Sequence, residues 1–291
     1  MLKFTLSNFY NNFTFFSFMD FLIHGRKEIF KEENIAFSYF EGNFPYCYWN
    51  GGYNNNYGKG AFYQDILEKV HLTTVPLRLN CSNVLLEDFD FNNVFGNLIL
   101  SLSDTGSNII EISNLKLMEY IKDKHPNYNY IFSKEAFLIN ELTPEIVNCI
   151  TKNDKILLVS LPEFYNDNIE FLNSLEDKSK IEITLNPRCD INCTNFYNCH
   201  LNVHKTQIDY SGQDVFQLCQ KNKRLQDSFI LDFNEIKEKY QKLGINNFYI
   251  NDNYHNENDY ASFFISNFIK QEYQISIYKE FLNIKEEERY D

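Results

Sequence analysis

Short runs of aliphatic and β-branched residues alternate along the chain with stretches whose apolar positions recur at helical spacing. Polar or turn-forming residues bound each run, as is typical of β-strands. The pattern therefore predicts eight strands, at Ile35–Phe40, Val75–Cys81, Asn108–Ser113, Asn129–Ser133, Lys155–Leu161, Lys180–Asn186, Ser228–Phe233 and Asn247–Asn251.

Helical patterns lie between these runs, and two of them have clear ends. Thr143 is a capping residue followed by Pro144 at the first helical position, and Gly244 closes a helix. The aromatic stretch Phe13–Ile23 is too short to span a bilayer and contains Asp20, so we expect a core-facing or barrel-plugging helix. Further helices are predicted at Ala61–Lys69, Leu115–Lys124, Pro144–Thr151, Ile169–Leu175 and Asn234–Leu243.

Strands that alternate with helices predict a parallel sheet, and eight such units predict closure into a TIM-like (β/α)₈ barrel. An open doubly wound sheet is the alternative, but its glycine-rich GxGxxG turn is absent. The length of 291 residues suits one barrel. We expect residues 1–34 to be an N-terminal extension packed on the barrel. Residues 35–291 would form the barrel, with an extra C-terminal helix over residues 271–291.

Composition narrows the class of protein. The 28 Phe and 20 Tyr indicate an aromatic core, and the net charge of −13 disfavours a nucleic-acid partner. No stretch has the features of a secretory signal or a membrane span, so we expect a cytoplasmic protein with a small-molecule substrate. Seven cysteines in that compartment are more often metal ligands, catalytic groups or core residues than disulfides.

Polar residues alternate with apolar ones on two predicted strands. Arg78, Asn80 and Ser82 share one face, as do Glu182, Thr184 and Asn186, and these faces are expected to point into the barrel. A buried arginine needs a partner, and Glu182 or Glu111 is expected to pair with Arg78. That pair would either fix strand register or leave an arginine that binds a substrate anion. The candidate catalytic residues are Arg78, Asn80 and Glu182, with Glu111 and Asp232 as further acid or base candidates.

A cysteine cluster directly follows the predicted strand Lys180–Asn186, in a segment rich in asparagine. Closely spaced thiolates in a cytosolic protein commonly share a metal. A [4Fe–4S] cluster and zinc both suit the spacing, whereas the CxxxCxxC motif of radical S-adenosylmethionine enzymes is absent. Cys149 lies in a helical pattern and is expected to be buried. The expected ligands are Cys189, Cys193, Cys199 and Cys219, with His200 and His204 as alternatives for the fourth position.

The sequence Asn186-Pro-Arg-Cys189, the cysteines after it and the later segment Asp232–Ile250 resemble the collagenase-like peptidase family of unassigned catalytic type, over about residues 75–253. The resemblance implies a TIM barrel that holds an iron–sulfur cluster on cysteines after a barrel strand. Members of that family include RNA-hydroxylation proteins and partners in oxygen-independent ubiquinone hydroxylation. The acidic charge of this chain disfavours an RNA substrate.

Three functions are therefore open. The first is an iron–sulfur oxidoreductase or hydroxylation-type enzyme that acts on a small molecule. The second is a zinc-stabilised barrel with a separate hydrolase or lyase pocket, in which two carboxylates divide the acid and base roles. The third is a non-catalytic binding barrel.

Overall fold

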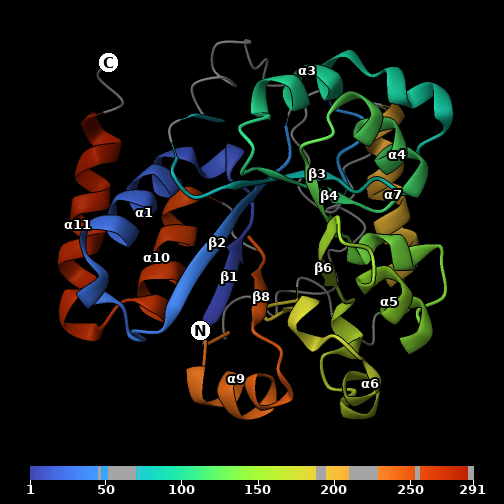
Figure 1. Ribbon diagram of the computed structural model, residues 1–291. Coiled ribbons are helices and arrows are strands. Elements are labelled where there is room, and N and C mark those ends of the chain that lie inside the picture. Colours follow the sequence, from blue (N-terminus) through green and yellow to red (C-terminus); the bar gives the residue numbers. More distant parts are fainter. Residues whose placement is uncertain are drawn as a thin grey trace.

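The computed structural model describes residues 1–44, 47–51, 70–71, 73–187, 195–209, 229–252 and 256–287. Its parallel strands form a closed barrel in chain order, and the last strand pairs back onto the first (Figure 1). The predicted TIM-like α/β barrel is confirmed. The strands are β1 (Leu2–Leu6), β2 (Ile35–Gly42), β3 (Leu77–Cys81), β4 (Ile109–Ile112), β5 (Asn129–Phe132), β6 (Ile156–Ser160), β7 (Ile181–Thr184) and β8 (Asn247–Ile250).

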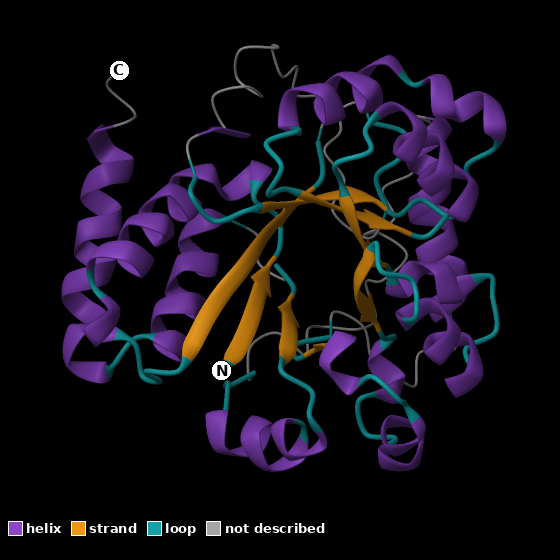
Figure 2. Ribbon diagram, viewed as in Figure 1, coloured by secondary structure: helices purple, strands orange, loops and turns teal. Residues whose placement is uncertain are grey.

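Helices surround the strands (Figure 2). Several of them occupy the predicted ranges and carry the predicted ends: the Thr143 side chain accepts from the backbone N–H of Ile146, and Gly244 has a φ of 92° in the left-handed region. The α-helices in the described residues are α1 (Phe13–Gly25), α3 (Val94–Ser103), α4 (Leu115–Lys124), α5 (Pro144–Thr151), α6 (Ile169–Ser174), α7 (Phe196–Asp209), α9 (Phe233–Lys239), α10 (Glu257–Phe268) and α11 (Gln271–Glu287).

The first strand lies in the segment that we expected to be an extension. In β1, Phe4 is in register with Phe37 on β2 and with Phe248 on β8, so this strand closes the barrel. The strand predicted over Ser228–Phe233 is wrong in its described part, because Asp232 caps α9 and Phe233 begins that helix. The barrel thus has eight strands, as predicted, but residues 1–34 provide one of them.

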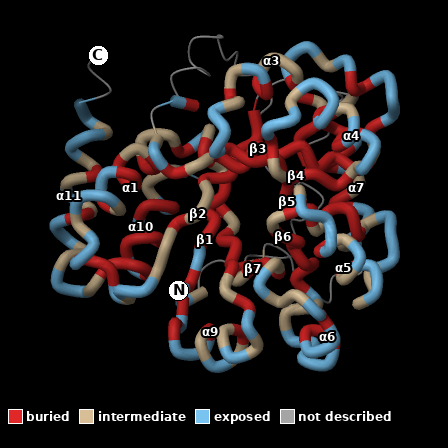
Figure 3. Tube along the Cα trace, in the orientation of Figure 1, coloured by how far each residue is buried: buried red, intermediate tan, exposed pale blue. Residues whose placement is uncertain are grey.

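Aromatic residues fill much of the layer between the strands and the outer helices, as their abundance predicts. On α1, Phe16 packs against Phe40 of β2 at a ring-centroid distance of 4.6 Å, and Phe15 contacts Phe264 of α10 at 5.5 Å. Helix α1 is therefore core-facing and lies outside the lumen. Figure 3 shows the buried residues concentrated on the strands and on the inner sides of the helices. Within the described ranges, no helix combines the length and the hydrophobicity needed to cross a bilayer.

Candidate active site at the barrel mouth

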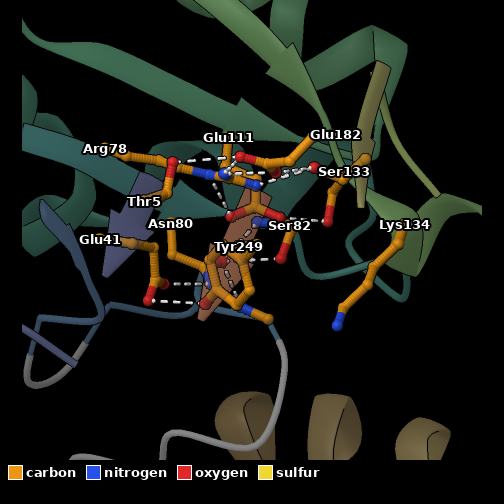
Figure 4. A network of polar contacts seen from close by, with 12 residues as sticks. Thr5, Glu41, Arg78, Asn80, Ser82, Glu111, Ser133, Lys134, Glu182 and Tyr249 are labelled. Atoms are coloured by element: carbon orange, nitrogen blue, oxygen red, sulfur yellow. Dashed lines mark hydrogen bonds and ion pairs between the residues drawn. The ribbon is translucent and has the colours of Figure 1, made fainter. Parts of the chain in front are cut away.

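Arg78 is fully buried in the barrel lumen and is the centre of an ion-pair network (Figure 4). Its Nε donates to Glu111 Oε2 at 3.0 Å, and its Nη1 donates to the two carboxylate oxygens of Glu182 at 2.9 and 2.7 Å. Its Nη2 donates to Ser160 Oγ at 3.0 Å. Burial alone would lower the pKa of Arg78, but Glu111 and Glu182 raise it overall. The predicted pairing is confirmed, and it involves both glutamates.

The two carboxylates around this guanidinium also accept hydrogen bonds from hydroxyl groups. Thr5 Oγ1 donates to Glu182 Oε1 at 3.1 Å, and Ser160 Oγ donates to Glu182 Oε2. Ser133 Oγ donates to Glu111 Oε1. The network therefore ties β1, β3, β4, β6, β7 and the end of β5 together, which is what a charge buried in a lumen requires.

Glu41, near the C-terminal end of β2, lies in the same lumen but has different partners. Asn80 Nδ2 donates to its Oε1 at 2.8 Å, while Tyr249 Oη and the backbone N–H of Asn8 donate to its Oε2 at 3.1 and 3.3 Å. In the described part of the chain Glu41 forms no ion pair, whereas Glu111 does. Burial, together with the charge of Glu111, raises the pKa of Glu41 to about 7, although the Asn80 hydrogen bond opposes the shift.

Tyr249 on β8 donates the hydrogen bond that reaches Glu41 across β1. Burial raises the pKa of Tyr249, and the nearby carboxylates Glu41 and Glu111 raise it further, so its hydroxyl stays neutral and remains a donor. Two cations approach its ring: Arg78 Cζ lies 5.0 Å and Lys134 Nζ 5.5 Å from the ring centroid. Both would favour negative charge that develops on the phenol oxygen.

Lys134 directly follows Ser133 at the C-terminal end of β5 and is half-buried. Its Nζ forms an ion pair with Glu163 and lies 3.4 Å from Thr184 Oγ1 at the end of β7. Burial alone would lower the pKa of Lys134, but Glu163 raises it overall, so the ammonium group is charged. Figure 4 shows this ammonium group reaching toward the side of the cluster that carries Tyr249.

Asn80 fixes the orientation of Glu41. Its Oδ1 accepts hydrogen bonds from the backbone N–H of Gly51 at 3.0 Å and from Ser82 Oγ at 2.7 Å, which leaves its amide N–H groups to face Glu41. A side chain at position 51 would place its Cβ 2.2 Å from Ser82 Oγ, so glycine is required for this approach. Asn80 was predicted to orient a substrate, and in the structure it positions the carboxylate.

The other predicted site residues have different surroundings. Arg78 and Glu182 have the contacts of a scaffold, and their predicted catalytic roles stay predictions. Asn186 pairs with the backbone of Asn251, which joins the ends of β7 and β8. Asp232 is not beside the lumen network, because its carboxylate accepts the N–H groups of the first turn of α9. Its prediction as an acid or base depended on a strand that is not formed there.

Helix α7 follows β7 in the chain but lies against the segments that follow β3 and β5. Glu135, which follows β5, lies 3.3 Å from His200 Nδ1 and 3.0 Å from His204 Nε2. The backbone N–H of Val84, after β3, donates to His204 Nδ1 at 3.1 Å, so the ring N–H that faces Glu135 is on Nε2. Asn83 Nδ2 also donates to the His204 carbonyl at 3.0 Å. The histidines therefore attach α7 to the rim of the barrel.

Glu135 is ionised in this setting. Burial alone would raise the pKa of its carboxyl, but His200 and His204 outweigh burial and hold the pKa well below its usual range. Neither histidine was expected to have this attachment role, since both were predicted only as alternative metal ligands.

The predicted cysteine cluster lies mostly outside the described residues, which include Cys199 but not Cys189, Cys193 or Cys219. Cys199 is buried on α7, where its backbone N–H donates to the carbonyl of Asn195 at 2.9 Å. Within the described ranges, no group of three or more His, Cys, Asp or Glu side chains has an arrangement that could hold a metal ion.

The remaining described cysteines lie in unlike surroundings. Cys47 and Cys81 are buried, and burial raises the pKa of Cys47 to about 12 and that of Cys81 above its usual value, so both are neutral thiols of the core. Cys149 is exposed, and its predicted burial was wrong. On α5 the buried positions are Val147 and Thr151, and Cys149 lies between them on the opposite side of the helix.

Comparison of the chain with protein-family models, with curated proteins and with solved structures finds no match. The class of protein is therefore defined by its fold, an eight-stranded parallel α/β barrel. In that class, catalytic groups come from the C-terminal ends of the strands and from the loops that follow them. Glu41, Lys134 and Tyr249 lie at such positions.

Glu41 was missed because the predicted strand ended at Phe40, two residues before the end of β2. Residues two apart in a strand share a face, so a strand extended past Phe40 would have placed Glu41 on the same face as Tyr39. Glu41 would then have been a lone carboxylate at the end of a largely apolar run. Lys134 gave no periodic signal, since it lies one residue beyond Ser133, where the predicted strand ended.

Proposed function

We propose that the protein is an enzyme that catalyses proton transfer on a small polar molecule at the C-terminal mouth of the barrel. The observation that supports this proposal is Glu41. It is a buried carboxyl with a pKa of about 7 and with no ion-pair partner among the described residues. A group that is half protonated near neutral pH both takes and releases protons efficiently, which is what general acid–base catalysis needs.

Tyr249 extends the reach of this carboxyl. When the phenol oxygen accepts a proton from the substrate, its own proton passes along the 3.1 Å hydrogen bond to Glu41 Oε2. The relay leaves the tyrosine neutral, in agreement with its raised pKa, and stores the proton on Glu41. Lys134 and Arg78 favour negative charge that develops on the phenol oxygen during the transfer. Isomerase and lyase reactions use steps of this kind.

Deuterium incorporation tests this function. Metabolites that bear carbonyl, carboxylate or phosphate groups are incubated with the protein in D₂O, and exchange or turnover is read by mass spectrometry. We expect exchange with wild type and at least about a hundredfold loss in Glu41→Gln and Tyr249→Phe, because general acid–base groups contribute roughly 10²–10⁴-fold. Glu170→Gln, an exposed carboxylate on α6, is the matched control and should keep the wild-type rate. Equal rates in all four proteins would overturn the assignment.

We also infer an iron–sulfur cluster held by Cys189, Cys193, Cys199 and Cys219, in line with the resemblance to the collagenase-like peptidase family. The position of Cys199 near the N-terminal end of α7 supports this inference, because a helix N-terminus favours the thiolate form that binds iron. When bound, such a cluster would supply electron transfer, and the family's chemistry would then be oxidoreductase or hydroxylation chemistry. Zinc on the same residues is the alternative.

Anaerobic purification followed by iron, sulfide and zinc analysis tests the cluster. We expect about four iron atoms per chain, with a broad visible absorption that Cys199→Ser reduces, as is typical of a Cys-ligated [4Fe–4S] cluster. Stoichiometric zinc without iron would assign the alternative metal, and a metal-free protein would exclude both.

A further inference from the structure

A groove lies where the segments after β3, β4 and β5 meet α5, and it shares no residue with the proposed proton-transfer site. Its cavity volume is about 1130 Å³, slightly larger than the roughly 300–1,000 Å³ of most small-molecule sites. We call this cavity the β3–β5 groove, and apolar side chains line its walls. They are Val84, Leu86, Phe132, Phe137, Ile146 and Ile150.

Large apolar side chains also surround its opening. Phe89 is 68% exposed, and Leu115 and Ile139 are each 54% exposed. Single exposed apolar residues are common on proteins and need no explanation. Three exposed apolar residues around one apolar groove do need an explanation, because a contiguous exposed apolar surface marks a binding site.

The charged groups of the opening are mostly acidic. Among the described residues that line the groove, the charged ones are Glu87, Asp88, Glu141 and Lys116. Lys116 is already paired with Asp88 at 3.1 Å, so among the described residues of the groove Glu87 and Glu141 have no cation beside them. The rim therefore repels an anionic head group and attracts a cationic one.

We propose that the β3–β5 groove binds a small amphiphile with an aliphatic or aromatic body and a cationic head group. The body packs between Phe132 and Phe137 of the β5 side and Ile146 of α5, and the head group lies at the rim near Glu141. Apolar burial provides the affinity, and the rim charge provides the selectivity between head groups.

Cys149 lines the same groove and is an exposed thiol, so it reports on occupancy. The rate at which iodoacetamide alkylates it is followed by mass spectrometry of its peptide, in the presence of decylammonium, decanol or decanoate below their micellar concentrations. We expect decylammonium to bind once per chain and to slow the alkylation at least about tenfold at saturation. Decanoate, with the same chain and the opposite charge, should bind at least about tenfold more weakly.

Matched variants separate the groove from general attraction of cations to a chain of charge −13. The double variant Phe89→Ser/Ile139→Ser should weaken decylammonium binding at least about tenfold. Ile275→Ser, which removes an exposed apolar residue from α11, should leave decylammonium binding unchanged. Three results would each overturn the proposal: no protection of Cys149 by any of the three compounds, equal affinity for decanoate, or unchanged binding by the double variant. Concentration-dependent self-association that protects Cys149 would assign the groove to a second copy of the chain and would overturn it as well.

Discussion

Tyr249 on β8 donates a 3.1 Å hydrogen bond to Glu41 on β2, so a single contact spans two strands that are separated by β1. The contact joins a phenol whose pKa is raised to a carboxyl whose pKa is about 7. Beside it, Arg78 forms ion pairs with both Glu111 and Glu182. The lumen therefore has a scaffold of paired charges and, beside it, one carboxyl that is poised to titrate near neutral pH.

Glu41→Gln should change how stability depends on pH. The pKa of Glu41 is raised on folding from an ordinary value of 4.5 to about 7, so its proton stabilises the folded state below pH 4.5, and this contribution is lost as the pH rises through 7. Over the full titration, wild type loses roughly 3 kcal/mol of folding stability from this group. The variant loses none, because glutamine does not titrate. Urea unfolding at pH 5 and pH 8 measures it.

The comparison between the two proteins cancels the titration of all other groups. We expect the free energy of unfolding of wild type, relative to Glu41→Gln, to fall by about 2.5 kcal/mol between pH 5 and pH 8. The glutamine amide also meets the donors Tyr249 and Asn8, which lowers the stability of the variant by a similar amount at both pH values. A difference that does not change with pH would show that Glu41 does not titrate in this range.

Arg78→Met should be strongly destabilising. Loss of the guanidinium leaves Glu111 and Glu182 as buried charges without a partner, which costs about 3–5 kcal/mol. Urea denaturation at pH 7 measures this. Lys122→Met, which breaks an exposed ion pair with Glu119 on α4, is the control and should cost less than about 1 kcal/mol. Similar small costs for both variants would argue against a scaffold role of the lumen network.

Glu135→Ala should loosen α7, because this carboxylate holds both His200 and His204. Hydrogen–deuterium exchange should show the amides of α7 exchanging at least about tenfold faster, while those of α4 keep their wild-type rates. Unchanged protection of α7 would mean that the contacts of Asn83 and Val84 with His204 are sufficient to hold the helix.

Gly96→Ala should destabilise the protein, although alanine favours a helix over glycine by about 1 kcal/mol. The new Cβ would lie 2.6 Å from the ring of Trp49, which is buried and is held by a hydrogen bond from its Nε1 to the carbonyl of Asp90. Overpacking of this kind costs roughly 1–3 kcal/mol. Gly25→Ala is the control, since its Cβ would lie 3.9 Å from Phe21, and it should be neutral or stabilising in thermal unfolding.

The parts of the fold that the sequence predicted correctly depend on local signals. Alternation on β3 and β7 placed Arg78 and Glu182 on inward faces, and the cost of an unpaired buried charge was enough to predict their pairing. The Thr143-Pro144 and Gly244 helix ends are equally local. Leu2–Leu6 has a similar alternation of apolar and polar residues, but it was missed because residues 1–34 were assigned to an extension.

The candidate site depended on contacts that no local pattern contains. The pKa of Glu41 depends on burial and on Glu111, and its hydrogen bonds come from Asn80 on β3 and Tyr249 on β8. The position of α7 on the rim is equally non-local, because Glu135 and Val84 lie on segments that follow other strands. Such contacts follow only from closure of the barrel.

Titration of the Glu41 carboxyl by ¹³C NMR, assigned by loss of its signal in Glu41→Gln, tests the central claim most directly. We predict one glutamate carboxyl with a midpoint near pH 7 in wild type that is missing from the variant. A Glu41 midpoint below pH 5 would contradict the proton-transfer assignment and would favour a barrel whose lumen charges serve structure alone.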